Sequence, residues 1–171
     1  MLLTLPYELP ELVTRAPLDI HQSKVLSQWV DWNGHMNMAF YALAFDQASG
    51  AFMSNIGLGR NYVESRSGMT FVLETHLTYD REMREHAPMR FTTQLLACDA
   101  KRVHLFHEMY HAGERYLAAT NETIVINIDF ATRRSAPWPA QVAERLEAVW
   151  SSHKKLPRPT KAGRIMGLAR K

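Results

Sequence analysis

The chain has 171 residues, of which 46% are hydrophobic and 22% charged, as in an ordinary globular protein. This length fits one domain with one sizeable core. A net charge of +3 is too small for a nucleic-acid footprint, so we expect no nucleic-acid partner. The single cysteine, Cys98, excludes an internal disulfide and suits a reducing compartment. The short apolar start, interrupted by Pro6 and Glu8, is unlike a signal peptide and favours a cytoplasmic protein.

The first stretch of the chain, residues 1–18, is rich in proline and lacks periodicity, which predicts an extended N-terminal arm. From Ile20 to Val30 a rough alternation of apolar and polar residues predicts a first strand. We expect the folded domain to cover residues 19–152. The remaining residues, 153–171, form a basic, proline-containing tail.

A polar run, Asp31-Trp32-Asn33-Gly34-His35-Met36-Asn37, directly precedes an almost uncharged segment. From Met38 to about Gly57 the apolar residues follow helical spacing, with Asn37 as a plausible N-cap. A helix that is apolar nearly all round is buried on most sides. Its one charge, Asp46, then requires a partner or a functional role. The polar groups within this helix exclude a membrane span, and we expect no membrane partner.

After the helix the hydrophobic period changes to two, which predicts four strands separated by short turns and therefore an antiparallel sheet. In the first of these we expect Phe71, Leu73, Leu77 and Tyr79 on one face, and Val72, Glu74, His76 and Thr78 on the other. A change of parity near Thr120–Asn121, within the segment from 116 to 130, predicts a bulge. Pro139 then opens a short amphipathic helix with Val142, Leu146, Val149 and Trp150 on one stripe.

The expected order is a strand, a buried helix, four antiparallel strands and a C-terminal helix. A single buried helix must be enclosed, and the sheet is the only element large enough to curl around it. The sequence therefore predicts an α+β hotdog fold, in which a curved antiparallel sheet wraps around one long central helix.

The polar run, followed by Ala39 and Tyr41, resembles the D-x-N-x-H-x-N signature of hotdog thioesterases of the 4-hydroxybenzoyl-CoA thioesterase type. The wider chain is similar to the branch of betainyl-CoA thioesterases of carnitine and betaine breakdown. That similarity rests on segments 31–35, 71–76, 94–96, 99–104, 135–137 and 162–168.

The resemblance places the family's catalytic aspartate on Asp31. A carboxylate just before a helix can attack a thioester carbonyl or activate water. Free N–H groups at the helix start, near His35 to Met38, can polarise the carbonyl oxygen. Gly34 would let the backbone approach the substrate. We expect no metal and no cofactor, with coenzyme A present only as part of the substrate.

Further candidates have structural alternatives. Asn33 and His35 either hold the loop by hydrogen bonds or take part in the chemistry. Glu74 is either a second active-site carboxylate that orients water or a surface or ion-pairing residue. The substrate-binding candidates are Trp32, Met36 and Tyr41 near the reacting end and Lys101 and Arg102, with Arg133 and Arg134, for CoA phosphates. A trimethylammonium acyl group would need aromatic faces, which Trp29, Trp32, Phe40, Tyr41 and Phe45 could supply unless they fill the core.

The leading functional hypothesis is an acyl-CoA thioesterase that hydrolyses a small acyl-CoA, with betainyl-CoA as a candidate. One alternative is an enoyl-CoA hydratase or dehydratase of the same fold, whose D-x-N-P-x-H pattern contains a proline that is absent between Asn33 and His35. Another is a non-catalytic acyl-CoA binding module. Because hotdog subunits generally pair, we expect a homodimer or a tetramer of dimers.

Overall fold

The structure, a computed structural model, describes residues 4–168. One antiparallel sheet has the strand order β1-β3-β4-β5-β2, so β1 and β2 form its edges. The elements follow the chain as β1 (Leu18–Lys24), a 3-10 turn (Ser27–Trp29), α1 (Met38–Asn55), α2 (Arg60–Glu64), β2 (Met69–Tyr79), β3 (Pro88–Cys98), β4 (Arg102–His111), β5 (Leu117–Ile128) and α3 (Ala140–His153).

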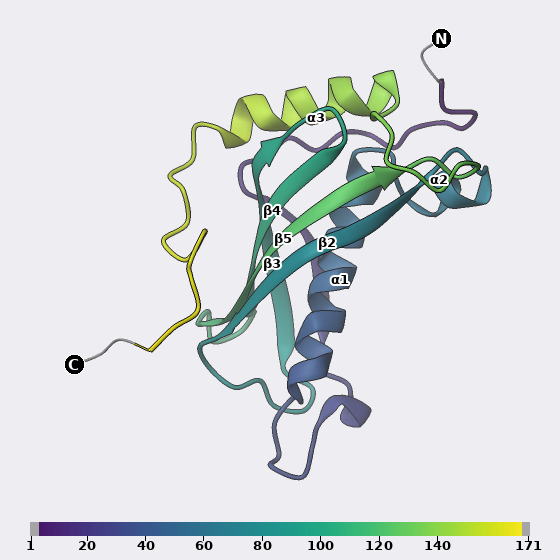
Figure 1. The fold of residues 1–171 in the computed structure, drawn as a ribbon. Helices are drawn as coiled ribbons and strands as arrows, with labels where there is room; N and C mark the ends of the chain where they lie inside the picture. Colours follow the sequence, from purple (N-terminus) through teal and green to yellow (C-terminus); the bar gives the residue numbers. More distant parts are fainter. Residues whose placement is uncertain (1–3, 169–171) are drawn as a thin grey trace.

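Helix α1 packs along one face of the twisted sheet, and α3 lies across one end of it (Figure 1). The core lies between α1 and the sheet. Phe45 and Phe52 of α1 pack there against Phe91, Leu95 and other sheet residues, and these four side chains are fully buried. The predicted α+β hotdog architecture is therefore confirmed. Within the residues described, no helix is both long and apolar enough to span a bilayer.

Burial of α1 is less complete than its composition predicts. Tyr41, Phe45 and Phe52 face the sheet and are buried, but Met38 is 67% and Leu43 41% exposed on the opposite side. The sheet covers only one face of the helix, so the expectation of burial on most sides is wrong for the single chain. The helix charge, Asp46, is exposed rather than buried.

Strand register differs from the sequence pattern at two places. Between Val72 and Glu74 the pairing of β2 with β5 shifts by one residue, so Leu73 is a bulge. The bulge inverts the alternation, and Phe71 therefore lies on the opposite face from Leu77. The bulge in β5 falls at Ala118, where the β4 pairing shifts, and not near Thr120–Asn121, where both pairings are regular.

The first strand ends at Lys24, earlier than predicted, because the chain turns at Ser27–Trp29. The Trp29 N–H donates to the Leu26 carbonyl within this turn, and the Trp29 ring stacks on Phe40. The apolar residues after Lys24 that continue the alternation therefore lie outside the sheet, and one of them, Trp29, packs against α1.

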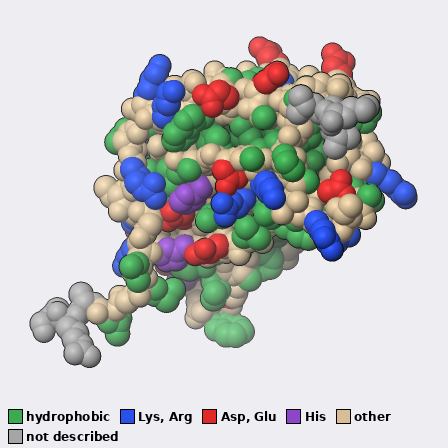
Figure 2. Space-filling model, turned by 45° about the horizontal axis from the view of Figure 1, so that its top comes forward, with side chains coloured by type: hydrophobic (Ala, Val, Ile, Leu, Met, Phe, Trp, Pro, Cys, Tyr) green, Lys and Arg blue, Asp and Glu red, His purple; other side chains and the backbone are tan. Residues whose placement is uncertain are grey.

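Both terminal segments make contacts with the folded domain, although the last described residues, 164–168, are exposed. The Leu5 N–H donates to Oε1 of Gln141 on α3, and the Leu5 side chain is buried. The Gly163 N–H donates to Oε2 of Glu122 on β5, which fixes the C-terminal segment along the sheet (Figure 1). On the face seen in Figure 2, basic and acidic side chains are interspersed and form no single-sign patch.

Candidate active site

Asp31 begins a tight loop, residues 31–37, that is closed by hydrogen bonds between its own residues. The Asp31 N–H donates to the His35 carbonyl at 3.0 Å, and the Gly34 N–H donates to the Asp31 carbonyl at 3.0 Å. Oδ1 of Asp31 accepts the Asn33 N–H at 2.8 Å, and Oδ2 lies 3.5 Å from Nδ2 of Asn37. These contacts orient the carboxylate, and the residue remains half-buried.

Gly34 supplies the backbone conformation that closes this loop. Its φ of +80° lies in the left-handed region, where residues with a Cβ are disfavoured. A Cβ at this position would meet nothing within 4 Å. The requirement for glycine is therefore conformational and not one of space.

The N-terminus of α1 follows the loop directly. Oδ1 of Asn37 accepts the Ala39 N–H at 3.0 Å, which confirms Asn37 as the N-cap. Of the amides predicted to polarise a carbonyl, the Met36 N–H donates to Met83 and the Asn37 N–H donates to Trp29. Among residues 4–168 the His35 and Met38 N–H groups have no acceptor. These two amides are free to bind an oxyanion at the positive end of the helix dipole.

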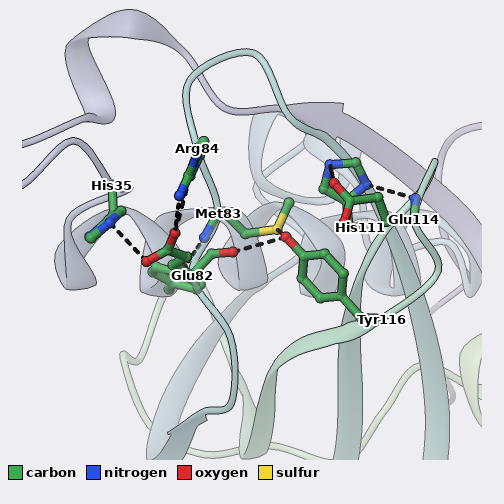
Figure 3. Close-up of polar contacts among 8 residues, drawn as sticks. His35, Glu82, Met83, Arg84, His111, Glu114 and Tyr116 are labelled. Atoms are coloured by element: carbon green, nitrogen blue, oxygen red, sulfur yellow. Dashed lines mark hydrogen bonds and ion pairs between the residues drawn. The ribbon is translucent and has the colours of Figure 1, made fainter.

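The β2–β3 loop holds the Asp31 loop in place (Figure 3). Nε2 of His35 lies 2.8 Å from a carboxylate oxygen of Glu82, and the Met36 N–H donates to the Met83 carbonyl at 2.8 Å. The Met83 N–H in turn donates to the Tyr41 hydroxyl at 3.1 Å. The polar run is therefore attached to a segment that lies more than forty positions later in the chain.

Tyr41 and Met36, both predicted substrate-binding residues, are buried beneath this loop. Burial raises the pKa of the Tyr41 phenol, and its hydroxyl oxygen accepts from the Met83 N–H. In contrast, Trp32 is 95% exposed beside Asp31. Of the other aromatic residues considered for a trimethylammonium group, Trp29 and Phe45 are buried. Phe40 is half-buried with one ring face stacked on Trp29, so Trp32 is the most exposed of the five.

Glu74 lies on the sheet face that points away from α1. It is paired with Ile124 of β5, which is in turn paired with His104 of β4. Side chains alternate along β4, so the opposite face carries those that point to α1, such as His107, whose Nε2 lies 3.0 Å from Oγ of Ser49. A single chain therefore does not bring Glu74 and Asp31 together, and its catalytic role stays a prediction.

Lys101 and Arg102 lie at the other end of the sheet from Asp31. Asp99 shapes their turn, because its Oδ1 accepts both of their N–H groups and its Oδ2 lies 2.7 Å from the Arg102 guanidinium. These hydrogen bonds, led by the one from Lys101, lower the pKa of the Asp99 carboxyl. Arg102 is thus partly neutralised, whereas Lys101 has no ion-pair partner within residues 4–168.

Sequence reasoning did not identify two features of this site. Asn37 was expected to act only as a cap, yet its amide also contacts Asp31. No local sequence pattern indicated a role for Glu82, because its contact with His35 forms only when the β2–β3 loop folds against the start of α1. Within residues 4–168 no three His, Cys, Asp or Glu side chains are grouped to hold a metal ion.

A carboxylate beside a helix start, on a hotdog scaffold, is an arrangement that a thioesterase can use. Residues 25–146 match the Thioesterase-like superfamily, and the chain belongs to this family. The prediction of a thioester hydrolase is confirmed at the level of the family.

Relatives with known names agree with this class. The chain is 38% identical over 151 residues to a betainyl-CoA thioesterase of Pseudomonas aeruginosa, covering 88% of this chain and 95% of the relative. It is 34% identical over 154 residues to an L-carnitine dehydrogenase/betainyl-CoA thioesterase of Rhizobium meliloti, covering 90% of this chain but 31% of that longer protein.

Two solved structures are also similar. A hypothetical protein from Staphylococcus aureus, solved in complex with CoA, superposes with a TM-score of 0.83 at 26% identity, covering 91% of this chain and 98% of that one. A putative thioesterase from Pseudomonas putida KT2440 gives a TM-score of 0.78 at 30% identity, covering 91% and 99%.

Proposed function

We propose that the chain is an acyl-CoA thioesterase in which Asp31 acts as nucleophile or general base. The observation that carries this proposal is that the oriented Asp31 carboxylate lies in the same short loop as the His35 N–H and directly before the Met38 N–H, and neither amide has an acceptor among residues 4–168. Support for CoA as part of the substrate comes from the similar Staphylococcus aureus protein, which was solved with CoA.

The reaction would proceed through attack on the thioester carbon. Asp31 either removes a proton from water, so that hydroxide adds to the carbon, or attacks directly to form an anhydride that water then hydrolyses. In both routes the carbonyl oxygen becomes negative and is stabilised by the free amides and the helix dipole. The tetrahedral species then collapses and expels the CoA thiolate, which takes up the proton that water gives up. The first route leaves the acid at once, whereas the second leaves the anhydride, which water cleaves to the acid and free Asp31.

We propose betainyl-CoA as the acyl-CoA substrate. The support is the 38% identity to a betainyl-CoA thioesterase over 95% of that relative. The betainyl group carries a quaternary ammonium, and the exposed ring of Trp32 offers it an aromatic face beside Asp31.

The active form is proposed to be a homodimer, or a tetramer of such dimers, joined through the edge strand β2. Val72 is 52% and Leu73 55% exposed on this edge, an arrangement that a monomer would leave open to other chains. A two-fold axis would pair the two β2 strands antiparallel and bring the Lys101 end of one subunit beside the Asp31 end of its partner. Lys101 could then meet the phosphates of a CoA whose thioester lies in the other subunit.

The central test is hydrolysis of a panel of acyl-CoAs, followed with a thiol reagent, by the wild type and by Asp31→Asn. We expect the substitution to reduce kcat at least about 100-fold, because it removes the nucleophile or base while keeping the side-chain shape. Equal rates for the two proteins would overturn the assignment of Asp31. Tight acyl-CoA binding with no turnover by the wild type would instead indicate a binding module.

Acyl specificity is tested with a neutral isostere. Betainyl-CoA and 3,3-dimethylbutyryl-CoA have the same shape, but only the first carries a charge. We expect betainyl-CoA to have the higher kcat/KM and Trp32→Leu to reduce that preference. A wild type that prefers the neutral ester would contradict betainyl-CoA as the substrate.

A cytoplasmic location, where thiols are kept reduced, is part of the same proposal and is supported by the lone Cys98.

A further inference from the structure

Two residues of the β2–β3 loop, Glu82 and Met83, link the Asp31 loop to the folded domain (Figure 3). On one side they contact His35 and Met36, as described above. On the other side the Tyr116 hydroxyl donates to the Glu82 carbonyl at 2.9 Å, and the Tyr41 hydroxyl accepts from Met83. Met83 is fully buried, so this segment has a fixed backbone from which the Glu82 side chain extends.

The Glu82 carboxylate contacts the residue that orients Asp31. One oxygen lies 2.8 Å from Nε2 of His35, while the other accepts from the Arg84 guanidinium at 2.9 Å. The His35 carbonyl is the acceptor for the Asp31 N–H. A displacement of His35 would therefore change the position of the Asp31 backbone and of the carboxylate attached to it.

We infer that Glu82 is a positioning residue for the reaction, acting on Asp31 through His35. The pair is 45% and 40% exposed, so its contribution to global stability is small. Its effect on rate can be much larger, because a misplacement of about 1 Å at a reacting group can cost on the order of 100-fold. Met36 and Asn37 fix one end of the loop by backbone bonds, and His35–Glu82 is the side-chain contact that fixes its centre.

This inference rests on the proposed function of Asp31, and its test separates the two. The variants are Glu82→Gln, which keeps an oxygen acceptor for His35, and Glu82→Ala, which removes it. We expect kcat to fall about 10-fold in Glu82→Ala and less in Glu82→Gln, with KM within about 2-fold of the wild type. Arg84→Ala is the matched control, because it removes the other partner of Glu82 and leaves the His35 contact; its kcat should be unchanged.

A double-mutant cycle distinguishes positioning from a general structural role. If Glu82 acts through His35, then His35→Gln combined with Glu82→Ala should be no slower than the slower single variant. Tyr116→Phe, which removes the bond to the Glu82 carbonyl, should lower kcat in the same direction with an unchanged KM. Melting temperatures of all variants show whether each remains folded.

Specific outcomes overturn the inference. Wild-type kcat in Glu82→Ala, with Asp31→Asn inactive, would remove Glu82 from the mechanism and leave the proposed function intact. Additive losses in the cycle would show that Glu82 does not act through His35. A wild type that hydrolyses no acyl-CoA, or an Asp31→Asn variant as fast as the wild type, would overturn the proposed function itself and the inference with it.

Discussion

Nδ2 of Asn37 lies 3.5 Å from Oδ2 of Asp31, while Oδ1 of the same amide accepts the Ala39 N–H. One side chain therefore both caps α1 and contacts the carboxylate that we place at the reacting carbon. The cap and the carboxylate are held at a fixed separation as a result. This relationship joins the stability of the helix start to the geometry of the site.

The two roles of Asn37 can be separated by substitution. Asn37→Ala should lower the free energy of unfolding by about 1 kcal/mol through loss of the cap and should also reduce kcat. Asn37→Ser keeps a capping oxygen but is too short to reach Asp31, so it should retain stability and lose activity. Chemical denaturation and steady-state kinetics measure the two effects. Full kcat in Asn37→Ser would show that the contact with Asp31 has no part in the reaction.

The left-handed backbone of Gly34 predicts an unusual order of tolerance. Gly34→Ala should cost roughly 1 kcal/mol and lower kcat, because alanine disfavours a positive φ and the loop would relax. Gly34→Asn, although larger, should be milder, because asparagine adopts this conformation more readily and no atom lies within 4 Å of the added Cβ. Melting curves and kcat are the measurements. An Asn variant as impaired as the Ala variant would mean that size, not conformation, sets the requirement.

Most of the fold could be predicted because its signals are local. The periods of α1, α3 and the strands depend on neighbouring residues, and the N-cap at Asn37 is visible in the sequence. The faces of β2 were mispredicted because a single bulge at Leu73 reverses every later position. The exposed face of α1 was missed because composition shows that a face is apolar but not what covers it.

The site was predicted in part for the same reason. Asp31, Asn33, Gly34 and His35 lie in one short run, so their proximity required no knowledge of the fold. The contact between His35 and Glu82 depends on how the β2–β3 loop meets the start of α1, which no local pattern encodes. The roles assigned to Glu74, Lys101 and Arg102 remain predictions, since one chain holds them away from Asp31.

The proposed dimer gives a prediction about β2. Leu73→Glu places a charge in the centre of the exposed edge and should shift the protein from dimer to monomer, with a loss of activity that follows the loss of dimer. Light scattering coupled to size exclusion measures the mass, and kcat is measured at the same concentrations. Leu168→Glu is the control, because Leu168 is 98% exposed and belongs to the C-terminal segment, not to β2. A wild type that is monomeric and fully active would contradict the shared arrangement.

His107 is a buried imidazole that links three elements of the core. Its Nε2 lies 3.0 Å from the Ser49 hydroxyl of α1, and its Nδ1 lies 2.8 Å from the Thr93 hydroxyl of β3. Burial, with a smaller contribution from His21, lowers its pKa from 6.5 to about 3. The folded protein therefore keeps His107 neutral at pH values where the unfolded chain would bind a proton.

The depressed pKa of His107 determines the sign of a pH effect on stability. Above pH 6.5 neither state protonates this ring, so its contribution is constant; below pH 6.5 the unfolded state binds the extra proton and stability falls until about pH 3. The expected slope is about 1.4 kcal/mol per pH unit from this group. Burial lowers the pKa of His21 and His153 as well, which adds slope of the same sign. Urea unfolding between about pH 5 and 7 should show this loss of stability. His107→Asn should lower the slope by the contribution of one bound proton, about 1.4 kcal/mol per pH unit. An unchanged slope in that variant would assign the acid sensitivity to the other histidines, and a ring of His107 that titrates near pH 6.5 by NMR would contradict its neutral burial.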